Sequence, residues 1–263
     1  MSGEAVVSPD GRLVAFTKAT PPTDPKPEPN ELEKELEARF EGQLYDGMQF
    51  RFDRRGYLPD PADPYRSPPR ELYIVAVEGG EPKRLTSLDV DVEDYSWSAD
   101  SLKLVFTADT HQRDAYVYEH ADLWIVDLEG QIERLTDDGF HHSAPAFSPD
   151  GTRIGYRRLK GLSLVIAEKA KRGAALDIYA MDLAARESVN VTADCALRPG
   201  APTWKSEGRY LYFDAGIGGS RHLFRASASG LESLERVELM VHRYHHQTEW
   251  WDEHLSGAAA SSQ

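Results

Sequence analysis

The segment with the most residues suited to chemistry is the stretch from Val241 to His254. It holds four of the nine histidines and two of the five tryptophans. Three of its residues could share one helix face and bind zinc, namely His242, His246 and either Glu249 or Glu253. The H-E-x-x-H motif is absent, however,. We therefore favour a structural role, in which Trp250 and Trp251 anchor the segment over an exposed sheet edge.

A second histidine pair, His141-His142, precedes a predicted strand in a connection between two repeats. A ligand contact is one interpretation of this pair, and a structural role is the one that we favour. The sequence contains no other constellation with the spacing of a known site. We therefore expect no catalytic residue, no cofactor-binding residue, no metal ligand and no cofactor.

The composition excludes several classes of protein. The 263 residues include 44 acidic and 30 basic side chains, a net charge of −14, which argues against a nucleic-acid partner because binding phosphates needs clustered Lys and Arg. No run approaches the roughly 18 apolar residues of a membrane span. The N-terminus lacks the features of a signal peptide, and the lone Cys195 excludes a disulfide framework. We expect a cytoplasmic protein with no membrane partner.

The elements that must position any site are set by a repeat, because one unit recurs four times. Each copy begins with a turn: Ser8-Pro9-Asp10-Gly11, Ser98-Ala99-Asp100-Ser101, Ser148-Pro149-Asp150-Gly151 and Lys205-Ser206-Glu207-Gly208. An aromatic residue follows five positions after each turn: Phe16, Phe106, Tyr156 and Phe213. Another aromatic lies four positions before the end of the last three turns: Trp97, Phe147 and Trp204. Pro, Asp and Gly at these positions favour a tight hairpin turn.

A second hairpin follows in each unit. Its first strand begins at Glu71, Asp122, Asp177 or His222, and three of the four copies close on Arg84-Leu85-Thr86, Arg134-Leu135-Thr136 or Asn190-Val191-Thr192. Two hairpins make a four-stranded meander of about 40 to 50 residues, the size of one propeller blade. The sequence therefore predicts an all-β fold, a β-propeller of about four four-stranded antiparallel blades in an incomplete ring. A sandwich or barrel is the alternative.

These residues resemble the TolB-like, PD40-type propeller repeat. Within that group the chain is similar to the N-terminal propeller of the prolyl oligopeptidase family of serine peptidases, in its acylaminoacyl-peptidase-like branch. The stretches that carry this resemblance are Leu72 to Thr86, Leu123 to Thr136, Gly200 to Arg225 and Arg51 to Tyr57. The resemblance implies a propeller that filters substrates by size above a hydrolase active site.

The resembled family also has an α/β-hydrolase domain with Ser, Asp and His, and that domain is not visible here. Its nucleophile lies in a G-x-S-x-G turn between a strand and a helix. The nearest strings, at 218–222 and 226–230, do not match and fall inside a blade. We therefore expect that this chain does not hydrolyse peptides by itself.

Three segments depart from the repeat. We expect blades over residues 1–235, with an insertion at 20–70 in the first blade and a C-terminal tail at 236–263 that covers an edge or is disordered. The insertion is predicted to contain a short amphipathic helix from Glu31 to about Arg39, after a capping residue at Asn30. The excursion from Gly161 to Ala175 is predicted to be a hairpin tip, a short helix or a surface loop.

Two functions remain open on the sequence alone. The first is a non-catalytic, substrate-gating propeller from a peptidase-like protein, whose partner is a peptide substrate or a hydrolase domain. The second is a stand-alone TolB-like platform for another protein. A propeller lactonase would need converging Glu, Asn and Asp, and we rank it last.

Overall fold

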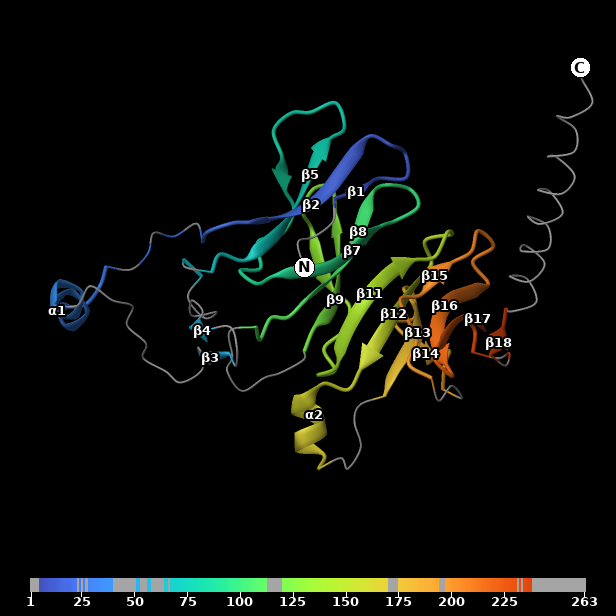
Figure 1. The fold of residues 1–263 in the computed structure, drawn as a ribbon. Helices are drawn as coiled ribbons and strands as arrows, with labels where there is room; N and C mark the ends of the chain where they lie inside the picture. Colours follow the sequence, from blue (N-terminus) through green and yellow to red (C-terminus); the bar gives the residue numbers. More distant parts are fainter. Residues whose placement is uncertain are drawn as a thin grey trace, which may run out of the picture. The chain divides into compact units, whose positions relative to one another are not determined.

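The computed structural model describes residues 5–22, 24, 26, 28–39, 51–52, 56–57, 64–65, 67–112, 120–169, 175–193, 197–230, 232 and 234–237. Most of the regular structure in this part of the chain is β (Figure 1). The chain forms two compact units, Met1–Pro145 with Leu159–Ala174, and Ala146–Arg158 with Ala175–Gln263. Within the described residues, no helix is long and apolar enough to span a bilayer.

Four four-stranded antiparallel sheets follow one another along the chain, as the repeat predicted. The first contains β1 (Val6–Val7), β2 (Leu13–Ala19), β5 (Arg70–Ala76) and β6 (Lys83–Arg84). The second contains β7 (Val92–Trp97), β8 (Lys103–Ala108), β9 (Asp122–Asp127) and β10 (Ile132–Arg134). The third contains β11 (His141–Phe147), β12 (Arg153–Leu159), β13 (Leu176–Asp182) and β14 (Ser188–Asn190). The fourth contains β15 (Thr203–Trp204), β16 (Tyr210–Ile217), β17 (Ser220–Ser227) and β18 (Glu235–Arg236).

Each sheet is a meander in which neighbouring strands are also neighbours in the chain, apart from the insertion between β2 and β5. Among the described residues, no sheet combines strands from both ends of the chain. This is the all-β blade architecture that the sequence predicted, and the ring is not closed within the described part.

The first hairpin turn of three sheets has one hydrogen-bond pattern. The serine hydroxyl donates to the aspartate two residues later, in the pairs Ser8–Asp10 (2.6 Å), Ser98–Asp100 (2.6 Å) and Ser148–Asp150 (2.5 Å). The same hydroxyl oxygen accepts the backbone N–H five residues on, at 2.9 Å, from Leu13, Lys103 and Arg153. These serine bonds are the largest cause that lowers the pKa of Asp10, Asp100 and Asp150.

The last residue of each turn has a left-handed backbone conformation. Three copies have glycine there, Gly11 (φ 74°), Gly151 (φ 70°) and Gly208 (φ 64°), and the second has Ser101 (φ 63°). Serine is disfavoured at positive φ. The buried Ser101 hydroxyl, however, accepts the backbone N–H of Asp10 at 3.1 Å, which joins the turn of the second sheet to that of the first.

Gly151 gives a direct test of this turn geometry. No atom lies within 4 Å of a Cβ built there, so the cost of Gly151→Ala comes from its positive φ alone. We expect the free energy of unfolding to fall by about 1–2 kcal/mol, measured by urea denaturation. Gly216→Ala is the matched control, because its φ is not positive and the nearest atom to the added Cβ lies 4.0 Å away. An unchanged midpoint for Gly151→Ala would contradict the expected strain.

The second hairpin of three sheets is closed by an acid–threonine pair. The threonine hydroxyl donates to a carboxylate at the start of the hairpin, in the pairs Thr86–Glu71, Thr136–Asp122 (3.0 Å) and Thr192–Asp177 (3.2 Å). The same oxygen accepts the next backbone N–H, from Leu72 (2.8 Å), Leu123 (2.9 Å) and Ile178 (2.9 Å). In the first two sheets an arginine joins the carboxylate, as Arg84–Glu71 (3.0 Å) and Arg134–Asp122 (2.5 Å).

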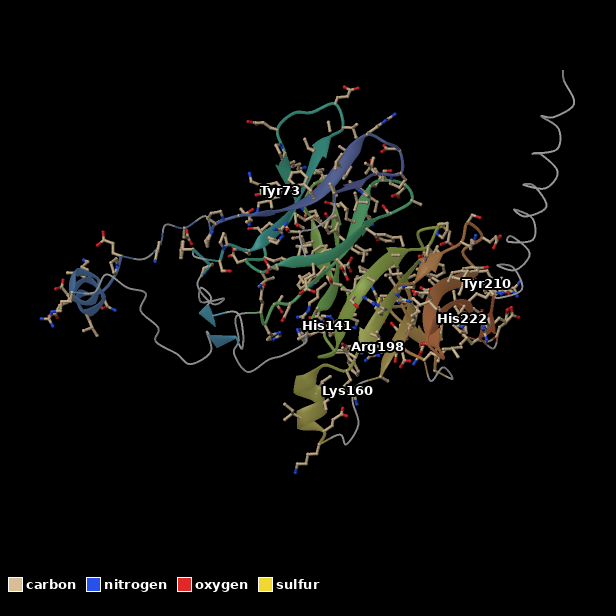
Figure 2. All side chains as sticks on the ribbon, in the orientation of Figure 1. Tyr73, His141, Lys160, Arg198, Tyr210 and His222 are labelled. Atoms are coloured by element: carbon tan, nitrogen blue, oxygen red, sulfur yellow. The ribbon has the colours of Figure 1, made fainter. Side chains whose placement is uncertain are left out.

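The aromatic residues five positions after each turn form one stacked pair per sheet. The pairs are Phe16–Tyr73, Phe106–Trp124, Tyr156–Tyr179 and Phe213–Phe224, with ring centroids 5.7 to 6.3 Å apart. Figure 2 shows Tyr73 on β5. Such pairs stabilise by about 0.5–1.5 kcal/mol beyond the area that they bury.

Two tryptophans tie neighbouring sheets together. Trp97, at the end of β7, donates its indole N–H to the carbonyl of Val6 in β1 at 3.0 Å. Trp204, at the end of β15, donates in the same way to Ala146 in β11 at 2.9 Å. Phe147 takes this position in the third copy and has no N–H to donate. In the second and fourth copies, the aromatic residue before the turn therefore contacts the preceding sheet as well as its own.

The insertion lies between β2, which ends at Ala19, and β5, which begins at Arg70. Its helix α1 spans Glu31–Arg39, as predicted, and Leu32 on it is exposed. Two short strands, β3 (Arg51–Phe52) and β4 (Gly56–Tyr57), pair within the insertion. The second excursion contains a short helix, α2 (Leu162–Ala167), which was one of the three predicted forms.

Candidate functional site

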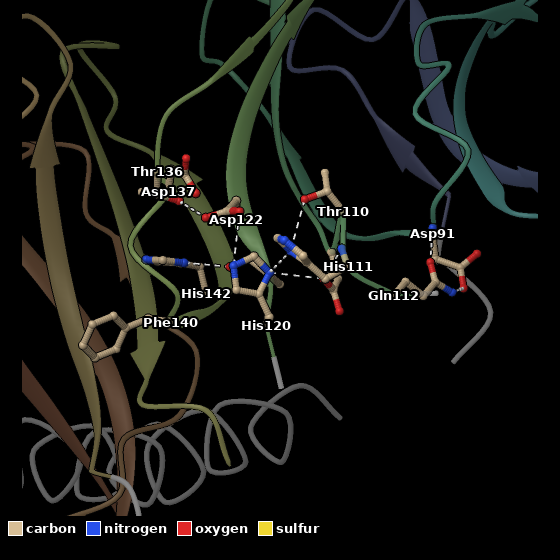
Figure 3. A network of polar contacts seen from close by, with 12 residues as sticks. Asp91, Thr110, His111, Gln112, His120, Asp122, Thr136, Asp137, Phe140 and His142 are labelled. Atoms are coloured by element: carbon tan, nitrogen blue, oxygen red, sulfur yellow. Dashed lines mark hydrogen bonds and ion pairs between the residues drawn. The ribbon is translucent and has the colours of Figure 1, made fainter. Parts of the chain in front are cut away.

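A cluster of histidines and aspartates lies at one end of the second sheet (Figure 3). Strands β8 and β9 pair in antiparallel register with Ala108 opposite Asp122. Residues just after β8 must therefore lie near those just before β9, and these are Asp109 and His111 on one side and His120 on the other. The connection brings D-x-H and H-x-D sequences together.

Three side chains meet closely in this cluster. Oδ1 of Asp109 lies 3.1 Å from Nδ1 of His120 and 3.9 Å from Nδ1 of His111. The two histidine Nδ1 atoms are 3.3 Å apart, and the rings meet edge to face with centroids 4.6 Å apart. His120 is 7% exposed, whereas the side chain of His111 is 46% exposed. The cluster thus has one buried wall and one side open to solvent.

The buried Asp122 lies on the far side of the His120 ring. Its Oδ2 atom is 3.6 Å from Nε2 of His120 and 2.5 Å from Nη2 of Arg134. The other carboxylate oxygen accepts the Thr136 hydroxyl. The acid of the second hairpin therefore has two roles, because it closes its own hairpin and also contacts His120.

A second group of possible ligands contains Asp122, Asp138 and His142. His142 is fully buried, and its Nδ1 lies 2.7 Å from the carbonyl oxygen of Ala121, which requires a proton on Nδ1. Its Nε2 is 3.6 Å from Asp138. Since Arg134 already neutralises Asp122, this second group is the less suitable one for a cation.

The turn that presents His111 is held from both sides. The Asp109 carboxylate accepts the backbone N–H of His111 at 2.8 Å. The side-chain amide of Gln112 donates to the carboxylate of Asp91 and accepts the backbone N–H of the same residue, both at 2.6 Å. Asp91 in turn accepts the backbone N–H of Arg70 at 2.7 Å. These bonds fix the turn against the loop that leads into β7.

The surroundings of the cluster are negatively charged. Desolvation raises the pKa of Glu93, and the charges of Asp94, Asp109 and Asp91 raise it further. Glu93 has exposed surface. We therefore give the three carboxylates more weight than desolvation as causes of its raised pKa. Negative charges that hinder ionisation of a neighbouring acid also attract cations.

The structure places the histidines named from the sequence in different ways. The sequence predicted that His141 and His142 precede a strand, whereas they are the first two residues of β11. The backbone N–H of His142 donates to the carbonyl oxygen of Ala121, so the regular backbone begins here. The interpretation of the tail from Val241 to His254 lies outside the described residues. The cluster at Asp109, His111 and His120 was not expected from the sequence.

The fold defines the class of this chain, which is an all-β protein of four-stranded antiparallel propeller blades. No protein-family model matches the chain, and no curated protein matches it significantly. Among solved structures, the putative TolB from Agrobacterium tumefaciens matches 89% of this chain with a TM-score of 0.54 and 15% identity. A puromycin hydrolase S511A mutant complexed with PGG matches 90%, with a TM-score of 0.54 and 14% identity. An oligogalacturonate lyase in complex with manganese matches 89%, with a TM-score of 0.53 and 12% identity.

These matches show the fold, and they bear out the predicted similarity to TolB-like and peptidase propellers at that level. The chain spans less than two thirds of each matched protein, namely 63% of the putative TolB, 52% of the lyase and 30% of the puromycin hydrolase. It therefore corresponds to a portion of each of these proteins.

Proposed function

We propose that this chain is a binding module, the propeller portion of a serine peptidase of the prolyl oligopeptidase type, which admits peptides to a hydrolase domain and does not cleave them itself. The observation that carries the proposal is the match to the puromycin hydrolase, which covers 90% of this chain but 30% of that protein. High coverage of this chain with low coverage of the other protein is expected when this chain corresponds to a single part of a larger hydrolase.

The acidic surroundings of the cluster suggest the chemistry of the ligand. A peptide with a free amino end carries positive charge, which the carboxylates near Glu93 attract,. An N-acetylated peptide of the same sequence lacks that charge. We propose that the module prefers peptides with a free amino terminus, and that salt reduces the preference because exposed charges are screened.

Two assays on the purified full chain test this function. With fluorogenic peptidase substrates we expect no turnover, and turnover that a serine reagent abolishes would overturn the non-catalytic assignment. In fluorescence polarisation at low salt, we expect a free-amine peptide to bind more tightly than its acetylated form. Glu93→Gln should reduce this difference, whereas Glu187→Gln at an exposed position of the second unit should not. Equal binding of both peptides would contradict the proposed ligand.

The match to the putative TolB supports a second candidate, a self-contained platform for protein partners. That match covers 63% of TolB, a larger share than for the other two proteins. Size-exclusion chromatography with light scattering separates the candidates. A stable, monodisperse monomer favours the platform, whereas self-association through unpaired strand edges favours a module that needs its hydrolase domain.

A further inference from the structure

We propose that Asp109, His111 and His120 form a binding site for a divalent transition-metal ion of the zinc class. The site goes beyond the proposed peptide-binding function: it shares Asp109 with the carboxylates near Glu93, but its test uses no peptide. Its ligands would be the Oδ1 atom of Asp109 and the Nδ1 atoms of the two histidines, which lie at the end of β8 and just before β9.

The spacing of the three ligand atoms is that of a metal site. Their separations are 3.1 Å, 3.3 Å and 3.9 Å. A triangle with these edges contains a point about 2.0 Å from all three atoms, which is close to the bond length of zinc to histidine nitrogen and carboxylate oxygen. An ion can therefore be bound without a large rearrangement of the ligands.

The buried Asp122 lies beside the other ring nitrogen of His120. Metal-bound histidines usually direct their other ring nitrogen toward a carboxylate or carbonyl, which fixes the tautomer and makes the ligand more basic. The Nε2 atom of His120 lies 3.6 Å from Oδ2 of Asp122, while Nδ1 faces Asp109 and His111. Without an ion, Nδ1 of His120 donates to the Asp109 carboxylate. A metal ion would displace that proton, and a proton on Nε2 would then face Asp122.

The choice of ion follows from the ligand types and from the exposure of the site. Imidazole nitrogens suit zinc and its first-row neighbours, whereas magnesium and calcium prefer oxygen ligands alone. Three protein ligands leave a coordination position for water or a ligand group. The His111 side chain, 46% exposed, gives an ion access from solvent.

The test is isothermal titration of the full chain with Zn²⁺, with Mg²⁺ as the comparison ion. Histidines in the tail can also bind zinc, so the titration is repeated in a full-length background in which His242, His245, His246 and His254 are replaced by glutamine. In that background we expect one saturable Zn²⁺ site and no Mg²⁺ binding. Co²⁺ absorption then reports whether the ligands are nitrogen and oxygen.

Variants assign the site to its residues. His111→Ala and Asp109→Asn should each weaken Zn²⁺ binding at least about tenfold. Two matched controls should leave binding unchanged: His222→Ala on β17, and Asp137→Asn, whose partner is Arg134. Circular dichroism of each variant checks folding, and because His111 is half exposed its variant is expected to fold. The absence of saturable Zn²⁺ binding in the background, or binding that both site variants retain, would overturn the proposal. Neither outcome depends on the peptide assays.

Discussion

Replacing Glu71 with alanine is expected to lower the free energy of unfolding by about 3–5 kcal/mol, the cost of breaking a buried ion pair from one side. The Glu71 side chain is fully buried. It accepts four hydrogen bonds, from the Arg84 guanidinium, the Thr86 hydroxyl and the backbone N–H groups of Leu88 and Asp89. Alanine would leave all four donors without this acceptor. Chemical denaturation monitored by tryptophan fluorescence measures the change.

The chain offers two comparisons for this prediction. Glu78→Ala, at an exposed position of the β5–β6 turn, should change stability by no more than about 0.5 kcal/mol,. Asp177→Ala removes the corresponding acid of the third sheet, which is half-buried and pairs with Thr192. The copy there has asparagine in place of the arginine, so the loss should be smaller than for Glu71→Ala. Equal losses at both positions would show that the arginine–acid pair is not the source of the effect.

Replacing Trp97 with alanine is expected to cost about 3–5 kcal/mol, the usual range for a buried tryptophan. Trp97 is 8% exposed and belongs to a core that includes Ala15, Leu72 and Leu104. Its indole N–H also bonds to Val6 in the neighbouring sheet. The substitution therefore removes apolar packing shared by the first and second sheets, and a hydrogen bond to the first.

Trp97→Phe separates these two contributions. Phenylalanine occurs naturally at the same position of the third copy, as Phe147, so the repeat accommodates it. We expect this variant to lose about 1 kcal/mol for the missing hydrogen bond, with most of the packing kept. Hydrogen exchange should show faster exchange of the β1 amides in Trp97→Phe. Unchanged protection of β1 would mean that the indole bond does not hold that strand.

Much of the fold could be predicted because the repeat places the same residue types at the same offsets. The turn serines, the aromatic pairs and the R-L-T endings each mark a fixed position in a blade, and local turn chemistry sets the register. The partners of these residues were harder to foresee. Two examples are the bond from Trp97 to Val6 and the bond from the Thr86 hydroxyl to Glu71. Both depend on which strands are neighbours and on how the side chains fill the core.

The candidate site could not be predicted in the same way. Asp109, His111 and His120 lie in a connection that differs between the copies, so the repeat gives no guide to them. Their encounter follows from the register of β8 with β9, in which Ala108 faces Asp122. The D-x-H sequence after β8 and the H-x-D sequence at the start of β9 are the only indication of the cluster. They indicate a site only once the pairing of the two strands is known.

The bond between Trp97 and Val6 also orders events during synthesis of the chain. Val6 is translated 91 residues before the indole that holds its strand. At about 5–20 residues per second, the first strand waits roughly 5–18 s for this partner. The contacts of Glu71 with Thr86 span 15 residues and can form within about a second or a few seconds,. The second hairpin of the first sheet can therefore close soon after its own residues are made, whereas the edge strand β1 gains its indole partner only once much of the second sheet has been translated.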